Sequence, residues 1–318
     1  MGRLRKLGVG LVCLSLIAAM LAGCGSRQEP EITEELRVYA TFYPIYAVAS
    51  MITENVPNLY LNCLAQPQDG CLRSYALSDW DAALLGSADA VLMGGQGLER
   101  FEGAILSLGE NQLAVSEALY NVELARYTPE NTDADGESHW LDANPHIYMS
   151  IDGAIEIAGR IAQSMAVFDP RYEDLYSENL ASAEEKLGTL KEEIAGEIAG
   201  ISGEPAAVLN EALVYAARDY GLDIALCWDR ESGESMDESA FKELLAALEK
   251  NGTRVVLIEK QAPKSLCEAL ERAGVAGAAL DVLSTRRADE GYEGYFAAQR
   301  ANAAAVRQAY LSISEDNA

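Results

Sequence analysis

Residues 169–201, DPRYEDLYSENLASAEEKLGTLKEEIAGEIAGI, contain the pattern that decides the fold. Apolar side chains recur here every three or four residues, which is typical of one face of an α-helix. They are Tyr172, Leu175, Tyr176, Leu180, Ala183, Leu187, Leu190, Ile194 and Ile198. A helix of about thirty residues is about 45 Å long, at about 1.5 Å per residue, which exceeds one small lobe. We therefore predict a rigid helix that joins two lobes.

The chain on both sides of this helix alternates short apolar runs with helical patterns. Predicted strands lie at 37–43, 59–63, 90–93, 206–209, 223–227, 254–258 and 278–281, with helices between them. This alternation indicates parallel sheets. The expected fold is α/β, with two parallel-sheet lobes at 37–168 and 202–318 and the linking helix at 169–201. We expect a ligand cleft between the lobes, where the carboxyl ends of the strands meet.

The first residues of the chain are typical of an export signal. Basic residues precede an apolar run at 7–21, which is too short for a membrane span. The run ends in Leu-Ala-Gly before Cys24, which is similar to the lipobox of bacterial lipoproteins; an ordinary signal with a chance cysteine is the alternative. We predict a lipoprotein signal peptide at 1–23, a lipid on Cys24 and a polar tether at 24–36. The protein would then be lipid-anchored on the extracytoplasmic face of the cell membrane.

Composition excludes several functions. The 24 Lys and Arg residues face 50 Asp and Glu residues, which gives a formal net charge of −26. A nucleic-acid binder needs a basic surface, so we expect no such partner. The chain has two histidines and contains no Gly-x-Ser-x-Gly, Walker, GxGxxG or HExxH motif. We therefore expect no enzyme and no catalytic cofactor.

Four cysteines remain once Cys24 and one in the signal are set aside. Cys63 and Cys71 lie eight residues apart in a polar stretch, and an exported chain meets oxidising conditions. We predict a disulfide between them. Cys227 and Cys267 form either a second bridge or two buried thiols. No CxxC motif indicates a structural zinc site.

Six motifs resemble, in order, those of a known receptor family. They are ATFYPIY at 40–46, SADAVLMGGQGLE at 87–99, NPHIY at 144–148, YGL at 220–222, VLIEKQ at 256–261 and LDVL at 280–283. Together they resemble the zinc- and manganese-binding solute receptors of ABC importers, across residues 37–315. The resemblance implies a lipid-anchored receptor that captures a divalent metal ion, zinc or manganese, and delivers it to an ABC permease.

Members of this family hold the metal with four residues, one from each of four loops. The second ligand falls on His146 and the fourth on Asp281, whereas the first falls on Arg73 and the third on Asn210. Arginine stays protonated and has no lone pair to donate. At about 4 Å and an effective dielectric of about 20, it would repel a dication by roughly 8 kcal/mol. The resemblance thus implies an altered site.

Three interpretations of the cleft follow. In the first, His146 and Asp281 hold a metal with a substitute ligand, either Glu211, Glu259 or His139. In the second, Arg73 pairs with Asp281 and grips an uncharged or anionic ligand. In the third, that pair fills the cleft, and the protein is a surface interaction protein or adhesin that no longer binds metal. The first is our preferred prediction.

Two of these residues have a second interpretation. His146 is either a ligand or a packed, capping histidine. Glu259 is either functional or paired with a base. His139 lies in an acidic stretch and is expected to be exposed.

Overall fold

The computed structural model describes residues 35–65, 75–109, 113–119, 144–228, 230, 233–284 and 286–315. The predicted signal peptide and Cys24 lie outside these ranges. The described residues from Leu36 onward belong to one compact unit.

The first half of this unit builds a four-stranded parallel sheet in the order β2-β1-β3-β4. Its elements are β1 (Leu36–Ala40), α2 (Tyr43–Ile52), β2 (Leu59–Cys63), α3 (Asp79–Leu85), β3 (Ala90–Met93), α4 (Glu102–Gly109) and β4 (Ala114–Glu117). The predicted first strand stops at Ala40, three residues early. Pro44 lies in the first turn of α2, where its missing N–H costs nothing, so the helix begins there.

The second half repeats the same connectivity in the order β6-β5-β7-β8, again parallel throughout. Its elements are β5 (Pro205–Val208), α7 (Leu213–Asp219), β6 (Asp223–Cys227), α8 (Glu238–Lys250), β7 (Val255–Glu259), α9 (Lys264–Arg272) and β8 (Ala276–Leu280). The expected α/β class with two parallel sheets is confirmed. The exact lobe boundaries stay a prediction.

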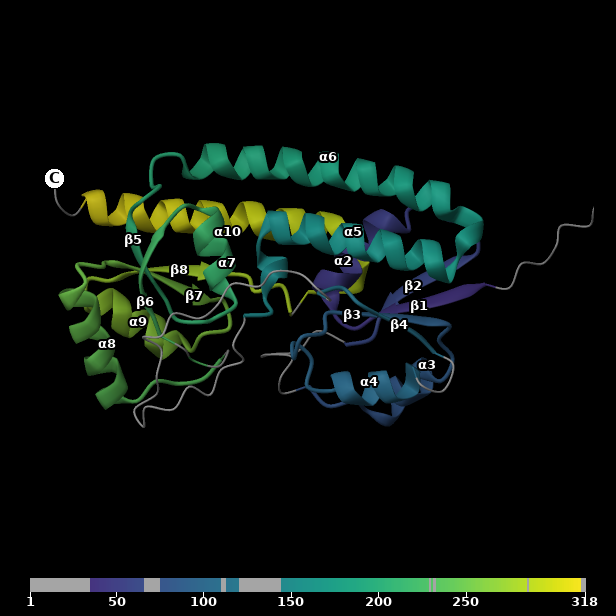
Figure 1. Ribbon diagram of the computed structural model, residues 1–318. Helices are drawn as coiled ribbons and strands as arrows, with labels where there is room; N and C mark the ends of the chain where they lie inside the picture. The colour runs from purple at the N-terminus through teal and green to yellow at the C-terminus, as the bar shows by residue number, and fades with distance from the viewer. Residues whose placement is uncertain are drawn as a thin grey trace, which may run out of the picture. The chain divides into compact units, whose positions relative to one another are not determined.

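Four further elements stand between the two halves: the 3-10 turn η2 (Ile147–Met149), α5 (Ile151–Phe168), the turn η3 (Pro170–Tyr172) and α6 (Glu173–Ile198). The predicted linking helix is α6, with 26 residues. A last turn, η4 (Ala288–Glu290), leads into α10 (Gly291–Glu315). In Figure 1, α10 runs beside α6. Because α10 packs on α2 as well as on β8, it joins the two halves alongside α6.

One apolar core runs through both halves, from Val38 on β1 to Tyr310 on α10. A smaller cluster packs α8 and α9 against the second sheet, through residues such as Leu244, Leu270 and Val256. Within the described parts of the chain, we find no helix with the length and apolar character of a membrane span.

Candidate functional site

The segment that carries His146 begins at Asn144 and runs into η2. Asn144 Oδ1 accepts the backbone N–H of His146 at 3.0 Å and lies 2.9 Å from its Nδ1. The imidazole is 4% exposed and packs edge-on against Tyr148. The amide of Asn144 also donates to the carbonyl of Glu211 at 2.9 Å. One asparagine therefore orients the histidine and ties it to the turn after β5.

Glu211 is the predicted substitute ligand that the structure brings to His146. Its Oε1 lies 3.7 Å from His146 Nδ1, and both side chains are buried. Asn210, at the expected third ligand position, uses its Oδ1 to accept the backbone N–H of Ala212 at 3.0 Å. Its amide approaches the carbonyl of Arg230 at 3.5 Å. Asn210 thus stabilises the turn, and the neighbouring carboxylate faces the histidine.

The segment 144–151 is fixed by side chains from the second half of the chain. Tyr215 donates to Asn144 O (2.8 Å), Asp219 accepts from Ser150 Oγ (2.9 Å) and Ile151 N (2.8 Å), Tyr295 donates to Tyr148 O (3.0 Å), and Gln299 donates to Met149 O (3.1 Å). Burial raises the pKa of Asp219, and its two hydrogen bonds oppose that shift. Because α7 and α10 supply all these partners, His146 keeps a fixed place relative to the second sheet.

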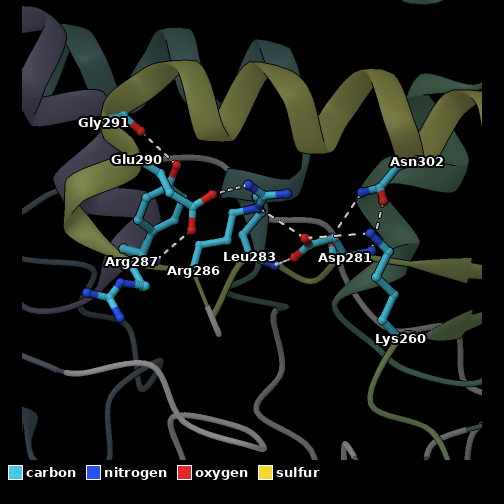
Figure 2. Close-up of polar contacts among 9 residues, drawn as sticks. Lys260, Asp281, Leu283, Arg286, Arg287, Glu290, Gly291 and Asn302 are labelled. Carbon is cyan, nitrogen blue, oxygen red and sulfur yellow. Dashed lines mark hydrogen bonds and ion pairs between the residues drawn. The ribbon is translucent and has the colours of Figure 1, made fainter.

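Asp281, at the expected fourth ligand position, directly follows β8 and is shown in Figure 2. Its backbone is held by Asn302 of α10 through a reciprocal pair: Asp281 N donates to Asn302 Oδ1 at 2.8 Å, and Asn302 Nδ2 donates to Asp281 O at 2.9 Å. The carboxylate Oδ1 accepts the backbone N–H of Leu283 at 2.8 Å. Asp281 is therefore held at the carboxyl end of β8 by two backbone bonds and one bond to its carboxylate.

The other carboxylate oxygen of Asp281 faces two cations. Arg286 Nε donates to Oδ2 at 3.0 Å, and Lys260 Nζ lies 3.8 Å from the same atom. Arg286 also pairs with Glu290, as Figure 2 shows. The sequence suggested that Arg73 could pair with Asp281; Arg73 lies outside the described residues, and the arginine found on Asp281 is Arg286.

Glu259, the last residue of β7, is fully buried and paired with a base. Its Oε1 accepts from Arg230 at 2.5 Å and from the backbone N–H of Gly233 at 3.1 Å. Of the two interpretations of Glu259, pairing describes what the structure shows. A metal would have to compete with a buried guanidinium for this carboxylate.

A second buried carboxylate, Glu99, joins the carboxyl ends of β1 and β3. It accepts from Thr41 Oγ1 at 2.6 Å and from the backbone N–H groups of Gly94 and Gly95 at 2.7 and 2.9 Å. Burial raises its pKa, and these three bonds oppose the shift. Glu99 therefore links the residues that follow β1 and β3.

The cysteines correct one prediction. Cys63 is a free, buried thiol whose Sγ donates to the carbonyl of Ala65 at 3.4 Å, so the predicted bridge does not hold it; Cys71 lies outside the described residues. Burial raises the pKa of the Cys63 thiol to about 12. Cys267 is a free, exposed thiol and Cys227 is partly buried, so they are neither a bridge nor two buried thiols.

Sequence reasoning missed several residues that shape the site. Asn144 stood inside the NPHIY motif, and its place two residues before the histidine was the available signal. Lys260 stood inside the VLIEKQ motif at 256–261, whereas Arg286 and Asn302 gave no such signal, because only the fold brings them to Asp281. His139 lies outside the described residues. Within the described part of the chain, no group of three His, Cys, Asp or Glu side chains is already assembled around a common point.

Comparison with known proteins places this geometry in context. The family model described as zinc-uptake complex component A, periplasmic, matches residues 38–309. The zinc-binding lipoprotein AdcA of Streptococcus pneumoniae strain R6 is 22% identical over 311 residues, which cover 94% of this chain and 60% of AdcA. The manganese ABC transporter substrate-binding lipoprotein PsaA of Streptococcus anginosus is 22% identical over 267 residues, 80% of this chain and 82% of PsaA. The chain thus spans about three fifths of AdcA.

Solved structures share the fold. The solute-binding protein FpvC of Pseudomonas aeruginosa, in complex with Mn²⁺, superposes with a TM-score of 0.74 at 21% identity, covering 89% of this chain and all of FpvC. Zn(II)-bound AdcA from Streptococcus pneumoniae gives a TM-score of 0.71 at 20% identity, covering 86% of this chain and 57% of AdcA. These likenesses confirm the two-sheet architecture that the sequence predicted.

Proposed function

The chain belongs to the zinc-uptake complex component A family, and on that premise we propose that it is the substrate-binding receptor of an ABC importer whose cargo is a divalent metal ion. AdcA and PsaA, by their names, bind zinc and serve a manganese transporter. The receptor would dock on its permease from the extracytoplasmic side, anchored through a lipid on Cys24. A non-metal ligand gripped by Arg73 is not favoured, because the named relatives are metal receptors.

One observation carries the proposal: His146 and Glu211, 65 positions apart in the sequence, lie 3.7 Å from each other in a buried setting. Imidazole and carboxylate are donors that zinc and manganese both accept. The side-chain oxygen of Asn210 already accepts a hydrogen bond from a backbone N–H. We therefore assign the third ligand position to the next residue, Glu211. Asp281 supplies a second carboxylate from the edge of the second sheet.

The charges support a dication as cargo. Two carboxylates, Glu211 and Asp281, would balance one divalent ion. A neutral His146 would add the lone pair of its Nε2, because its Nδ1 lies 2.9 Å from the accepting Oδ1 of Asn144. The formal net charge of −26 also raises the local concentration of cations around the protein. That field attracts any cation, so binding at the site must be separated from weak binding to surface carboxylates.

Native mass spectrometry of residues 25–318, purified without chelator and titrated with Zn²⁺ and Mn²⁺, tests the proposal. We expect one ion that survives competition from a chelator. His146→Ala and Glu211→Gln should lose it. Glu193→Gln, which removes an exposed carboxylate on α6 paired with Arg300, should keep it. Failure of the folded wild-type protein to retain either ion would refute the metal-receptor proposal.

A further inference from the structure

The carboxylate of Asp281 already holds two positive charges. Its side chain is 10% exposed, Arg286 is 19% exposed, and the Arg286 Nε lies 3.0 Å from Oδ2. Lys260, half-exposed, places its Nζ 3.8 Å from the same oxygen. The sum of these charges equals that of one divalent ion. Arg286 and Lys260 therefore place as much positive charge near the carboxylate of Asp281, the predicted fourth ligand, as a divalent ion would.

The chain around Arg286 is folded so that the guanidinium reaches this carboxylate. Leu283 adopts a left-handed backbone conformation with φ +68°, which is unfavourable for a residue with a side chain. Its N–H bonds to Asp281, and its carbonyl accepts the N–H of Arg286 at 3.2 Å. Glu290 holds the far side of the guanidinium and the N–H of Arg287. The turn is thus closed on itself at both ends (Figure 2).

We propose that Arg286, assisted by Lys260, competes with the cargo metal for Asp281 and so sets the affinity of the receptor. This inference rests on the proposed function. A guanidinium has no lone pair, so it cannot share coordination of the ion. If it stayed at Oδ2, it would repel the dication. Binding therefore requires that Arg286 leave Oδ2, and Glu290 retains the displaced guanidinium.

A competing internal cation lowers the apparent metal affinity, because the binding-competent arrangement is only a fraction of the population. Such a device suits a receptor that must release its cargo to a permease. When Arg286 returns to Asp281, it takes back the ligand oxygen and favours metal release. A positive charge lies at Oδ2 in both arrangements, the guanidinium in one and the metal ion in the other, so the buried carboxylate is always compensated.

The test compares neighbouring arginines. Arg286→Gln removes the competitor, whereas Arg287→Gln removes an exposed arginine that pairs with Asp289 and not with Asp281. Dissociation constants for Zn²⁺ and Mn²⁺ are measured by competition with a chelating dye. We expect Arg286→Gln to bind at least about tenfold more tightly than wild type, a difference of about 1.4 kcal/mol. Arg287→Gln should match wild type, and Arg286→Lys, which keeps the charge, should lie closer to wild type than Arg286→Gln.

For a second variant, Glu290→Gln, we expect the opposite change in metal affinity. This test does not depend on whether Arg286→Gln folds. Glu290→Gln removes the carboxylate that retains the displaced guanidinium, so it should weaken metal binding several-fold. Weaker or unchanged binding by folded Arg286→Gln would overturn the inference and make Arg286 a residue that positions Asp281. Unchanged or tighter binding by Glu290→Gln would also overturn it. If folded wild type retains neither ion, the proposed function itself fails, whatever Arg286→Gln binds. If wild type binds an ion and folded Arg286→Gln binds it no more tightly, this inference alone fails.

Discussion

Gly153 provides a test of how tightly the His146 segment is held. It lies in the first turn of α5, and a Cβ built on it would lie 2.1 Å from the carbonyl oxygen of Ile147 and 2.9 Å from its carbonyl carbon. That backbone would have to retreat by about 1.3 Å to reach ordinary contact. Gly159 is in the same helix and has nothing within 4 Å of such a Cβ. Alanine substitutions at Gly153 and Gly159 therefore differ mainly in the steric clash with Ile147, because both gain helix propensity.

Alanine stabilises a helix interior by about 1 kcal/mol relative to glycine. Gly159→Ala should therefore raise the free energy of unfolding by about 0.5–1 kcal/mol. Gly153→Ala has the same gain but must overpack against a backbone that five hydrogen bonds hold, which costs roughly 1–3 kcal/mol. We expect it to be less stable than Gly159→Ala by about 2 kcal/mol in urea unfolding.

The Gly153→Ala substitution should also lower metal affinity, because the backbone it displaces directly follows His146. Ile147 is bonded to His146, so a shift of its carbonyl moves the imidazole away from Glu211. Metal affinity should fall at least about tenfold, 1.4 kcal/mol, in Gly153→Ala and stay unchanged in Gly159→Ala. Equal stability and equal affinity of the two variants would show that the segment yields freely, and would refute the argument for a fixed His146.

Three further predictions concern other buried groups. Asn302→Ala removes both hydrogen bonds between residue 302 and the buried backbone of Asp281. The free energy of unfolding, measured by urea titration, should therefore drop by roughly 2–3 kcal/mol. Burial raises the pKa of Glu99 above 4.5 in the folded state. Just above pH 4.5, the folded state therefore binds more protons than the unfolded state. The contribution of this carboxyl group to stability is then lost as pH rises through the folded-state pKa. The stability of wild type relative to Glu99→Gln should therefore decline as pH rises from 4.5, and a rise would contradict the assignment. Without reductant, Cys267, which is exposed although partial burial raises its pKa, should be alkylated in the native protein. Cys63, buried and with a pKa of about 12, should react only after unfolding, and mass spectrometry that finds Cys63 unreactive even in denaturant would restore the predicted bridge.

Periodicity predicted the elements whose apolar pattern is long. Helix α6 has an apolar residue on nearly every turn, β3 is a continuous apolar run and β7 is apolar up to its last residue, Glu259, so all three appeared where expected. Strand β4 (Ala114–Glu117) was missed because it has four residues, two of them polar. Helix α5 carries an apolar residue every three or four positions, a signal that was present at 151–168 and not used.

The site was predictable only as far as its motifs. His146, Glu211 and Asp281 were found because they stand in or next to recognisable stretches. The cation on Asp281 was not, because Arg286 reaches it through a turn at Leu283 that uses a left-handed conformation normally reserved for glycine. A leucine at position 283 gives no sequence signal for a left-handed turn. Asn302 comes from a helix 21 positions later, and spacing alone cannot pair it with Asp281.

In the proposed receptor, the anchoring of the His146 segment would limit how the site can respond to a metal ion. Tyr215, Asp219, Tyr295 and Gln299 tie that segment to α7 and α10, and the reciprocal bonds of Asn302 tie Asp281 to α10 as well. Ligands from both positions therefore share one framework, which a rotation of the two sheets would not bring closer together. The part that can change is the side-chain arrangement between Asp281 and Glu290, where one guanidinium stands between two carboxylates. Capture then requires the local exchange of one cation for another, a smaller movement than the closure of two lobes.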